Sequence, residues 1–244
     1  MKKLLPFALL ALLALACRQN NVQTIQPEAY SPAPPPVVKT QEAPPDSTRP
    51  VRKTPQAAPD DPARHEFSDV AALNPGIRLD IRYATTNNFT KAKIYDCPRC
   101  LLRPGAAEAL VKAHQALQKK NMGLKMFDCY RPRPYQQRLW DKVPNPDYVT
   151  PPAKGSMHSR GAAVDLTIVD AQGKELDMGT PYDFFGKEAH YDYTQLPAAV
   201  LANRRLLRQT MEAVGYKGIR TEWWHFSYQG KNYELSDYVW PCPE

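Results

Sequence analysis

The chain has 244 residues, of which 43% are hydrophobic and 23% charged, with a formal net charge of +7. This length and composition can bury a sizeable core, which excludes a wholly disordered chain. The first 64 residues carry eight Lys/Arg and five Asp/Glu, which leaves 24 and 20 for the remaining 180. These charges are scattered and form no basic stripe, so the sequence does not favour a nucleic-acid partner.

The first 16 residues are predicted to be a signal peptide. Lys2 and Lys3 precede an almost unbroken apolar run that is too short for a membrane span. Cys17 follows the small Ala16 directly, as in a bacterial lipoprotein signal. We therefore expect an exported, periplasmic or cell-envelope protein anchored to the membrane through lipidated Cys17. The alternative is ordinary secretion with a chance cysteine.

Residues 17–64 are predicted to be a disordered tether. Positions 18–64 hold 11 of the 25 prolines, no glycine, and Tyr30 as their only aromatic residue. Such a segment buries too little apolar surface to offset the entropy of ordering, and its prolines favour extended chain. The folded catalytic domain is expected over residues 65–244.

Four cysteines remain after Cys17, namely Cys97, Cys100, Cys129 and Cys242. An even number in an exported domain predicts up to two disulfides, with three possible connectivities left open. Cys97-Pro98-Arg99-Cys100 could instead be half of a zinc knuckle or a redox pair. A knuckle would need a second C-x-x-C pair, which the sequence lacks, so structural disulfides are favoured.

Hydrophobic periodicity and breaker residues predict a regular series of elements in the domain. Strands are expected over 79–83, 124–131, 163–169 and 222–228; helices from Pro104 to 121–123, over 135–140 and from Pro197 to Gly215; and a loop over 155–161. The order lacks the regularity of βαβ units. The predicted fold is therefore α+β, a single domain with a mostly antiparallel central sheet flanked by helices.

The strand predicted over 163–169 contains one residue, Asp165, whose burial would cost free energy. Its apolar residues Val164, Leu166 and Ile168 alternate and should face a core, which leaves Asp165 and Thr167 on the other face. A lone carboxylate on so apolar a strand must be solvated, paired or bound to a metal.

Two histidines complete a candidate metal site with Asp165. His158 lies in the preceding loop, and Gly161 lets the intervening chain turn sharply; His225 lies on the last predicted strand. Two imidazoles and one carboxylate are the ligands of a catalytic zinc that keeps one position open. The alternative is a solvated loop histidine and an unrelated core histidine.

Glu222 is the candidate general base, because it could accept a proton from the attacking water near the metal. It lies three residues before His225, and an odd separation on a flat strand places the two side chains on opposite faces. A bulge, a twist or a strand end near Trp223 and Trp224 is therefore required. Arg131 could stabilise an oxyanion, although a surface ion pair is an equal alternative.

The motifs Ser156-x-His158-x2-Gly161-x-Ala163-x-Asp165 and Glu222-x2-His225 resemble the zinc D-alanyl-D-alanine dipeptidases of the VanX type. This family falls within the D,D-carboxypeptidase group that includes the VanY type and the Hedgehog-like fold. The resemblance extends through most of the domain, in the family's order, with Arg82-Tyr83-Ala84-Thr85, Tyr130-Arg131-Pro132, Met178-Gly179-Thr180, Tyr182-Asp183-Phe184 and Glu222-Trp223-Trp224-His225-Phe226.

The resemblance implies a role for each candidate residue. It makes His158, Asp165 and His225 the ligands of one zinc ion per chain, Glu222 the base and Arg131 the group that polarises the scissile carbonyl. It also implies that Ser156 and Asp183 contact substrate, with Asp183 facing the free ammonium of a dipeptide. The expected reaction is hydrolysis of D-Ala-D-Ala to two D-Ala.

Two other functions remain open from the sequence. One is a D,D-carboxypeptidase that trims peptidoglycan stem peptides. The other is a non-catalytic envelope-binding module with a structural metal, against which Glu222 argues, because a structural site needs no base.

Overall fold

The computed structural model describes residues 66–242. The predicted signal peptide, the lipidation site Cys17 and the tether over 17–64 therefore lie outside the described residues. Within the described part, no helix has both the length and the apolar character that a membrane span requires.

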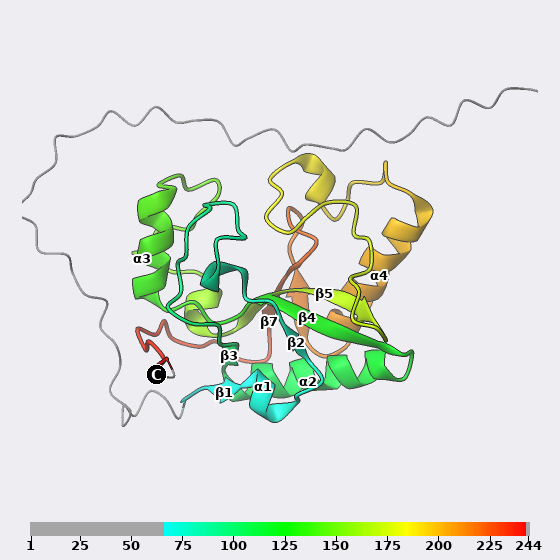
Figure 1. Cartoon of the computed structure of the whole chain (residues 1–244), viewed down its shortest axis with the longest axis horizontal. Coiled ribbons are helices and arrows are strands. Elements are labelled where there is room, and N and C mark those ends of the chain that lie inside the picture. The colour runs from blue at the N-terminus through cyan, green and yellow to red at the C-terminus, as the bar shows by residue number, and fades with distance from the viewer. Residues whose placement is uncertain (1–65, 243–244) are drawn as a thin grey trace, which may run out of the picture. The chain divides into compact units, whose positions relative to one another are not determined.

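A five-stranded sheet forms the centre of the fold (Figure 1). Its strands lie in the order β2 (Arg78–Leu79), β4 (Met122–Asp128), β5 (Ala163–Asp170), β7 (His225–Tyr228) and β6 (Tyr216–Gly218). Only the β2–β4 pair is parallel; the other three pairs are antiparallel. A small antiparallel sheet of β1 (Ser68–Asp69) and β3 (Leu101–Leu102) lies beside it. The α+β prediction is confirmed.

Two long helices supply much of the packing against this sheet. α2 (Pro104–Gln118) contacts β4, and α4 (Ala198–Glu212) contacts β6. Pro104 occupies the first turn of α2, where its missing N–H costs nothing. The shorter elements are α1 (Val70–Leu73), α3 (Arg133–Lys142) and the 3-10 turns η2 (Arg82–Ala84), η3 (His158–Arg160) and η4 (Lys187–Ala189). All three predicted helices are present.

β5 runs through the middle of the sheet, and its alternation agrees with the prediction. Val164, Leu166 and Ile168 are fully buried in the hydrophobic core. Asp165 and Thr167 face the other side and are also buried, at 4% and 0% exposure. Asp165 therefore needs partners inside the protein.

Two strand predictions were too long. The strand expected over 79–83 stops at Leu79, because the chain then turns through η2, where the Thr85 N–H donates to the Arg82 carbonyl. β4 ends at Asp128 after a register shift between Met126 and Asp128, so Arg131 lies beyond the strand. Neither break was visible in the pattern of side-chain types.

β7 is also shorter than expected, and this removes the difficulty with Glu222. The strand begins at His225, and the His225 N–H donates to the Glu222 carbonyl at 3.4 Å across a turn formed by Trp223 and Trp224. The predicted strand end is confirmed. Face alternation therefore does not apply between Glu222 and His225.

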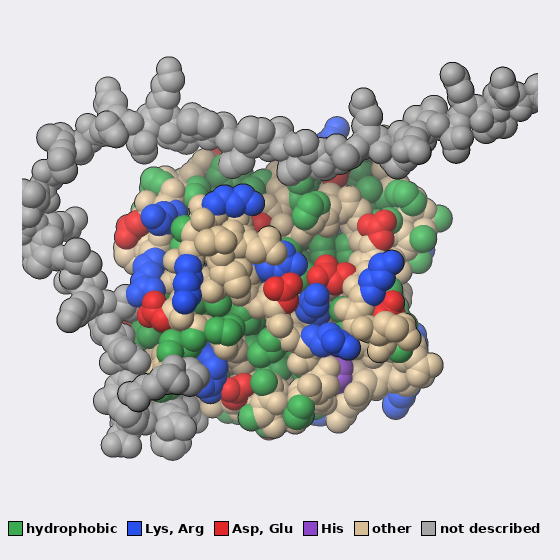
Figure 2. Space-filling model, viewed as in Figure 1, with side chains coloured by type: hydrophobic (Ala, Val, Ile, Leu, Met, Phe, Trp, Pro, Cys, Tyr) green, Lys and Arg blue, Asp and Glu red, His purple; other side chains and the backbone are tan. Residues whose placement is uncertain are grey.

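The structure selects one of the three disulfide connectivities. Cys97 is bonded to Cys242 and Cys100 to Cys129. On the face shown in Figure 2, Lys/Arg and Asp/Glu side chains are interspersed.

Candidate active site

The strand register brings two candidate metal ligands together. Asp128, Asp165 and His225 are successive cross-strand partners on β4, β5 and β7. The third candidate, His158, begins the 3-10 turn η3, which ends at Gly161 with φ of 69°. That left-handed conformation favours glycine and returns the chain to β5, as the sequence predicts.

The three candidate ligands present one nitrogen or oxygen each to a common point. His158 Nε2 lies 3.3 Å from Asp165 Oδ1 and 3.2 Å from His225 Nδ1, and His225 Nδ1 lies 3.0 Å from Asp165 Oδ1. Ligands about 2.0–2.1 Å from a tetrahedral zinc are about 3.3–3.4 Å apart. The three donors thus outline one face of such a tetrahedron, and the residues fit a zinc ion.

Each ligand is oriented by a further contact. His158 Nδ1 lies 2.7 Å from the Cys129 carbonyl, which can only accept, so Nε2 keeps its lone pair for a metal. The Tyr182 hydroxyl donates to Asp165 Oδ2 at 3.0 Å, and His225 Nε2 lies 3.1 Å from Ser227 Oγ. Such outer contacts fix ring orientation and tautomer in metal sites.

The electrostatics keep the three groups strongly coupled. Burial alone would raise the pKa of Asp165, but His158 and His225 hold it below its usual range. Burial alone would lower the pKa of His158, but Asp165 and Asp128 raise it above its ordinary value. The cluster therefore attracts positive charge, in the form of protons when no metal is bound.

Arg131 is buried rather than on the surface, which excludes the surface ion pair. Its Nη2 and Nε donate to Asp128 Oδ2 at 2.6 and 3.1 Å, and Nη1 donates to Gln136 at 3.1 Å. Asp128 is fully buried and also accepts from the Tyr95 hydroxyl at 2.6 Å. The guanidinium is thus held in one orientation.

One cavity of about 330 Å³ gathers all of the predicted site residues. Its lining includes Arg131, Ser156, His158, Asp165, Asp183, Glu222 and His225, which come from widely separated parts of the sequence. Tyr148, Phe185 and Ile219 also line it and are partly exposed. A cavity with convergent polar groups and an apolar surround is typical of a small-molecule site.

Two further carboxylates face this cavity. Glu222 Oε2 lies 3.9 Å from His225 Nδ1, and burial raises the pKa of Glu222. Asp183 accepts from the Tyr83 hydroxyl at 3.2 Å, and burial together with the charge of Asp165 raises its pKa well above the usual value. The raised pKa reflects a destabilised carboxylate anion. A positive charge placed beside either group would stabilise that anion.

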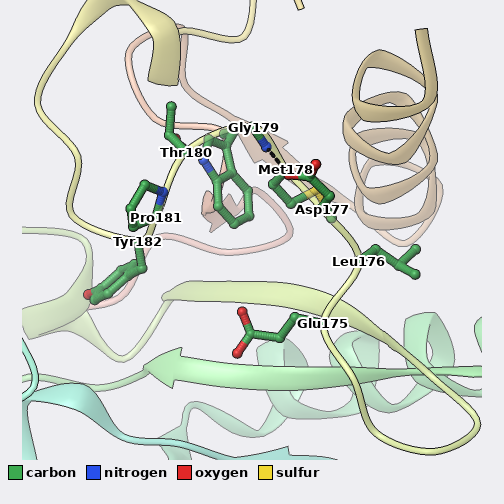
Figure 3. Close-up of a pocket in the computed structure, with 9 residues that line it drawn as sticks. Glu175, Leu176, Asp177, Met178, Gly179, Thr180, Pro181 and Tyr182 are labelled. Carbon is green, nitrogen blue, oxygen red and sulfur yellow. Dashed lines mark hydrogen bonds between the residues drawn. The ribbon is translucent and has the colours of Figure 1, made fainter. Parts of the chain in front are cut away.

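Asp183 is supported by the segment Glu175–Tyr182, which lines a second cavity of about 360 Å³ with Trp223. Figure 3 shows this segment, with Tyr182 at one end. The Trp223 indole donates to Thr180 at 2.8 Å, and Arg204 on α4 donates to the Met178 carbonyl at 2.7 Å. These anchors precede Asp183, whose φ of 60° lies in the left-handed region that aspartate tolerates.

Ser156 lines the main cavity and also has a local structural role. Its hydroxyl oxygen accepts from the Ser159 N–H at 3.2 Å and lies 3.3 Å from Ser159 Oγ. These bonds stabilise the turn that carries His158.

Four residues of the site were not predicted from the sequence, namely Tyr83, Asp128, Lys154 and Tyr182. Asp128 and Lys154 lie close in sequence to Arg131 and Ser156, but nothing in the pattern marked them as different from other charged residues. Tyr83 and Tyr182 fell within recognised segments, without any signal for their hydroxyl contacts.

The chain matches known proteins over most of the described domain. The family model described as D-ala-D-ala dipeptidase matches residues 63–239. The D-alanyl-D-alanine dipeptidase of Escherichia coli is 39% identical over 70% of this chain and 89% of its own length. That of Enterococcus faecium is 32% identical over 72% and 97%, and that of Streptomyces coelicolor 33% over 66% and 91%.

Solved structures give a more distant likeness. The structure of VanYB in complex with D-alanine-D-alanine covers 54% of this chain and 73% of that one, with 16% identity and a TM-score of 0.36. The family match and the curated relatives each span most of the described domain. This chain therefore belongs to the D-Ala-D-Ala dipeptidase family of metallopeptidases.

Proposed function

We propose that this protein is a zinc-dependent dipeptidase that hydrolyses D-Ala-D-Ala to two D-alanines. The observation that carries the proposal is the single cavity lined by a zinc-fitting His/Asp/His group, a carboxylate beside it and a buried arginine. The family membership of residues 63–239 supports the substrate.

The proposed metal ligands are His158, Asp165 and His225, with Glu222 as the base. When bound there, zinc supplies a Lewis acid that polarises a carbonyl and makes water more acidic. Glu222 lies close enough to His225 to take the proton of the attacking water and pass it to the leaving amine. Its location before the Trp223–Trp224 turn, rather than on β7, lets it face the same cavity.

Arg131 is proposed to stabilise the oxyanion that forms on the scissile carbonyl. Asp128 and Gln136 hold its guanidinium in place before substrate binds, so little reorganisation is needed during the reaction. Only part of its hydrogen-bonding capacity is used by these partners, since each terminal nitrogen carries two protons.

The two ends of the dipeptide need opposite charges. Asp183 suits the free ammonium, because its raised pKa falls again when a cation is placed beside it. Lys154 suits the free carboxylate: it lines the same cavity and, within residues 66–242, it takes part in no ion pair. Ser156 lies two residues from Lys154 and also lines this cavity with its hydroxyl-bearing side chain.

The decisive experiment compares D-Ala-D-Ala with N-acetyl-D-Ala-D-Ala in a chromatographic assay of released D-alanine. We expect the free dipeptide to be strongly preferred, because a blocked amine leaves Asp183 buried and unpaired. Comparable release from the acetylated substrate would identify a D,D-carboxypeptidase instead. No release from either, with zinc bound, would favour the non-catalytic module.

We propose in addition that the protein is an exported lipoprotein of the cell envelope. The supporting features are the apolar run before Cys17 and the two disulfides of the domain, which are typical of oxidising compartments. Cys17→Ala should shift the protein from the membrane fraction to the soluble fraction. A soluble wild-type protein without an N-terminal lipid in its mass spectrum would contradict this.

A further inference from the structure

The Cys100–Cys129 disulfide is adjacent to the proposed metal ligand His158. Both cysteines are buried, at 0% and 1% exposure. Cys129 is the first residue after β4, and its carbonyl lies 2.7 Å from His158 Nδ1. The same residue therefore carries one half of a disulfide and the group that orients a proposed zinc ligand.

The backbone around Cys129 connects several site residues. The Cys129 N–H donates to Asp128 Oδ1 at 2.9 Å, and Asp128 in turn holds Arg131. The Arg131 N–H donates to the His158 carbonyl at 3.1 Å. A shift of Cys129 would thus move the contacts of both His158 and Arg131.

This stretch has left the central sheet, so the strand ladder does not hold it. It is tied instead to the small sheet: the Tyr130 N–H donates to the Leu101 carbonyl at 3.0 Å, beside Cys100. The Cys100 carbonyl accepts from Val70 at 2.9 Å, which fixes Cys100 at the start of α1. The disulfide is the covalent part of this attachment.

We propose that the Cys100–Cys129 disulfide is a positioning element of the active site. It holds the Cys129 carbonyl where it fixes the tautomer and the ring of His158, and it keeps Asp128 and Arg131 in register with them. Loss of an outer contact of this kind costs about 10–100-fold in metal affinity or activity. The inference rests on the proposed zinc site, but it can be tested without any peptide substrate.

The second disulfide provides a matched control. Cys97–Cys242 joins residues 145 apart, against 29 for Cys100–Cys129, and among the described residues neither of its cysteines contacts a proposed metal ligand, as the Cys129 carbonyl does. In the chain-entropy description, the longer closed loop contributes more to stability. Removing Cys97–Cys242 should therefore lower Tm at least as much while leaving the metal site intact.

The experiment compares C100A/C129A with C97A/C242A in the full chain. Zinc affinity is measured by competition with a chromophoric chelator, site geometry by the visible absorption of the Co²⁺ form, and stability by Tm. We expect C100A/C129A to bind zinc about 10–100-fold more weakly, with altered Co²⁺ bands and a lower kcat at saturating zinc. We expect C97A/C242A to change Tm alone.

The proposal is overturned if C100A/C129A keeps wild-type zinc affinity and Co²⁺ bands. It is also overturned if zinc affinity falls in both variants in proportion to the decrease in their Tm. If C100A/C129A does not fold, the C97A/C242A chain is treated with a phosphine reductant, which then acts on the remaining disulfide. Its zinc affinity should fall while its near-ultraviolet circular dichroism persists; unchanged affinity after verified reduction overturns the proposal. Absence of dipeptidase activity in the wild type would refute the proposed function and leave the zinc readout interpretable.

Discussion

At the scale of single residues, Glu222 is the most direct test of catalysis. Glu222→Gln preserves the shape of the side chain and removes the proton acceptor. We expect kcat on D-Ala-D-Ala to fall about 10²–10⁴-fold, the usual contribution of a general base. Zinc content, measured by metal analysis, should stay at one ion per chain. Unchanged kcat in a zinc-loaded variant would refute the enzymatic assignment.

Lys154 tests how the substrate carboxylate is recognised. Lys154→Met should raise KM for D-Ala-D-Ala about tenfold, the equivalent of one charge-assisted hydrogen bond, with little change in kcat. Lys154→Arg keeps the charge and should stay close to wild type. The C-terminal amide of the dipeptide provides the comparison, because wild type and Lys154→Met should use it equally. If the KM of Lys154→Met for D-Ala-D-Ala equals that of wild type, Lys154 does not bind the substrate carboxylate.

The raised pKa of His158 predicts how zinc binding depends on pH. Asp165 and Asp128 raise this pKa against the effect of burial, so in the metal-free protein a proton competes for Nε2 at a higher pH than usual. Zinc affinity should therefore be constant at pH values above that pKa. Below it, the affinity should fall about tenfold per pH unit for each proton that zinc displaces. Chelator competition between pH 5.5 and 8 measures this. Affinity that does not change over the whole range would contradict the assignment of His158 as a ligand.

At the scale of elements, the turn η3 is the most sensitive part of the site. A Cβ on Gly161 would lie 2.6 Å from Phe67, at a φ of 69°. Backbone strain alone should reduce the free energy of unfolding of Gly161→Ala by about 1–3 kcal/mol. The clash with Phe67 should reduce it further. Because Gly161 ends the turn that carries His158, zinc affinity should fall as well.

Gly215→Ala is the matched control for this turn. Gly215 has a φ of 91°, but among residues 66–242 a Cβ there would meet only Tyr228, at 3.6 Å. The Gly215→Ala variant should have the backbone strain without the steric clash, and its zinc affinity should be unchanged. Urea unfolding and chelator competition measure both quantities. Equal zinc affinity in the two variants would show that η3 tolerates displacement.

At the scale of the whole molecule, the catalytic domain should function without the first 62 residues. The family match begins at residue 63, and all described elements lie within 66–242. A chain that begins at residue 63 and retains Cys242 should keep the Tm and the kcat/KM of the full protein within about twofold, because the two disulfides and the core are all retained. An inactive shortened chain beside an active full-length protein would assign the N-terminal segment a role in folding.

The sequence predicted the fold class and placed the candidate site residues in segments that the folded chain brings to one cavity. All seven predicted site residues of the domain line one cavity, and the three candidate metal ligands lie within 3.3 Å of one another. Strand lengths were less accurate, because β4 ends after a register shift and β7 begins only after the Trp223–Trp224 turn. The buried environment of Arg131 was not predictable either, since its partner Asp128 is indistinguishable in sequence from a surface aspartate.

By itself the sequence determined which groups are candidates for the chemistry: the proposed His/Asp/His ligands and Glu222 are residue types whose spacing indicates a metal hydrolase. The tertiary structure alone decided how they are held. It selected the Cys97–Cys242 and Cys100–Cys129 pairs, aligned Asp128, Asp165 and His225 across three strands, and placed the Cys129 carbonyl on His158. The reason is physical: ligand identity depends on local chemistry, whereas orientation depends on contacts between segments far apart in the chain, which only the folded backbone brings together.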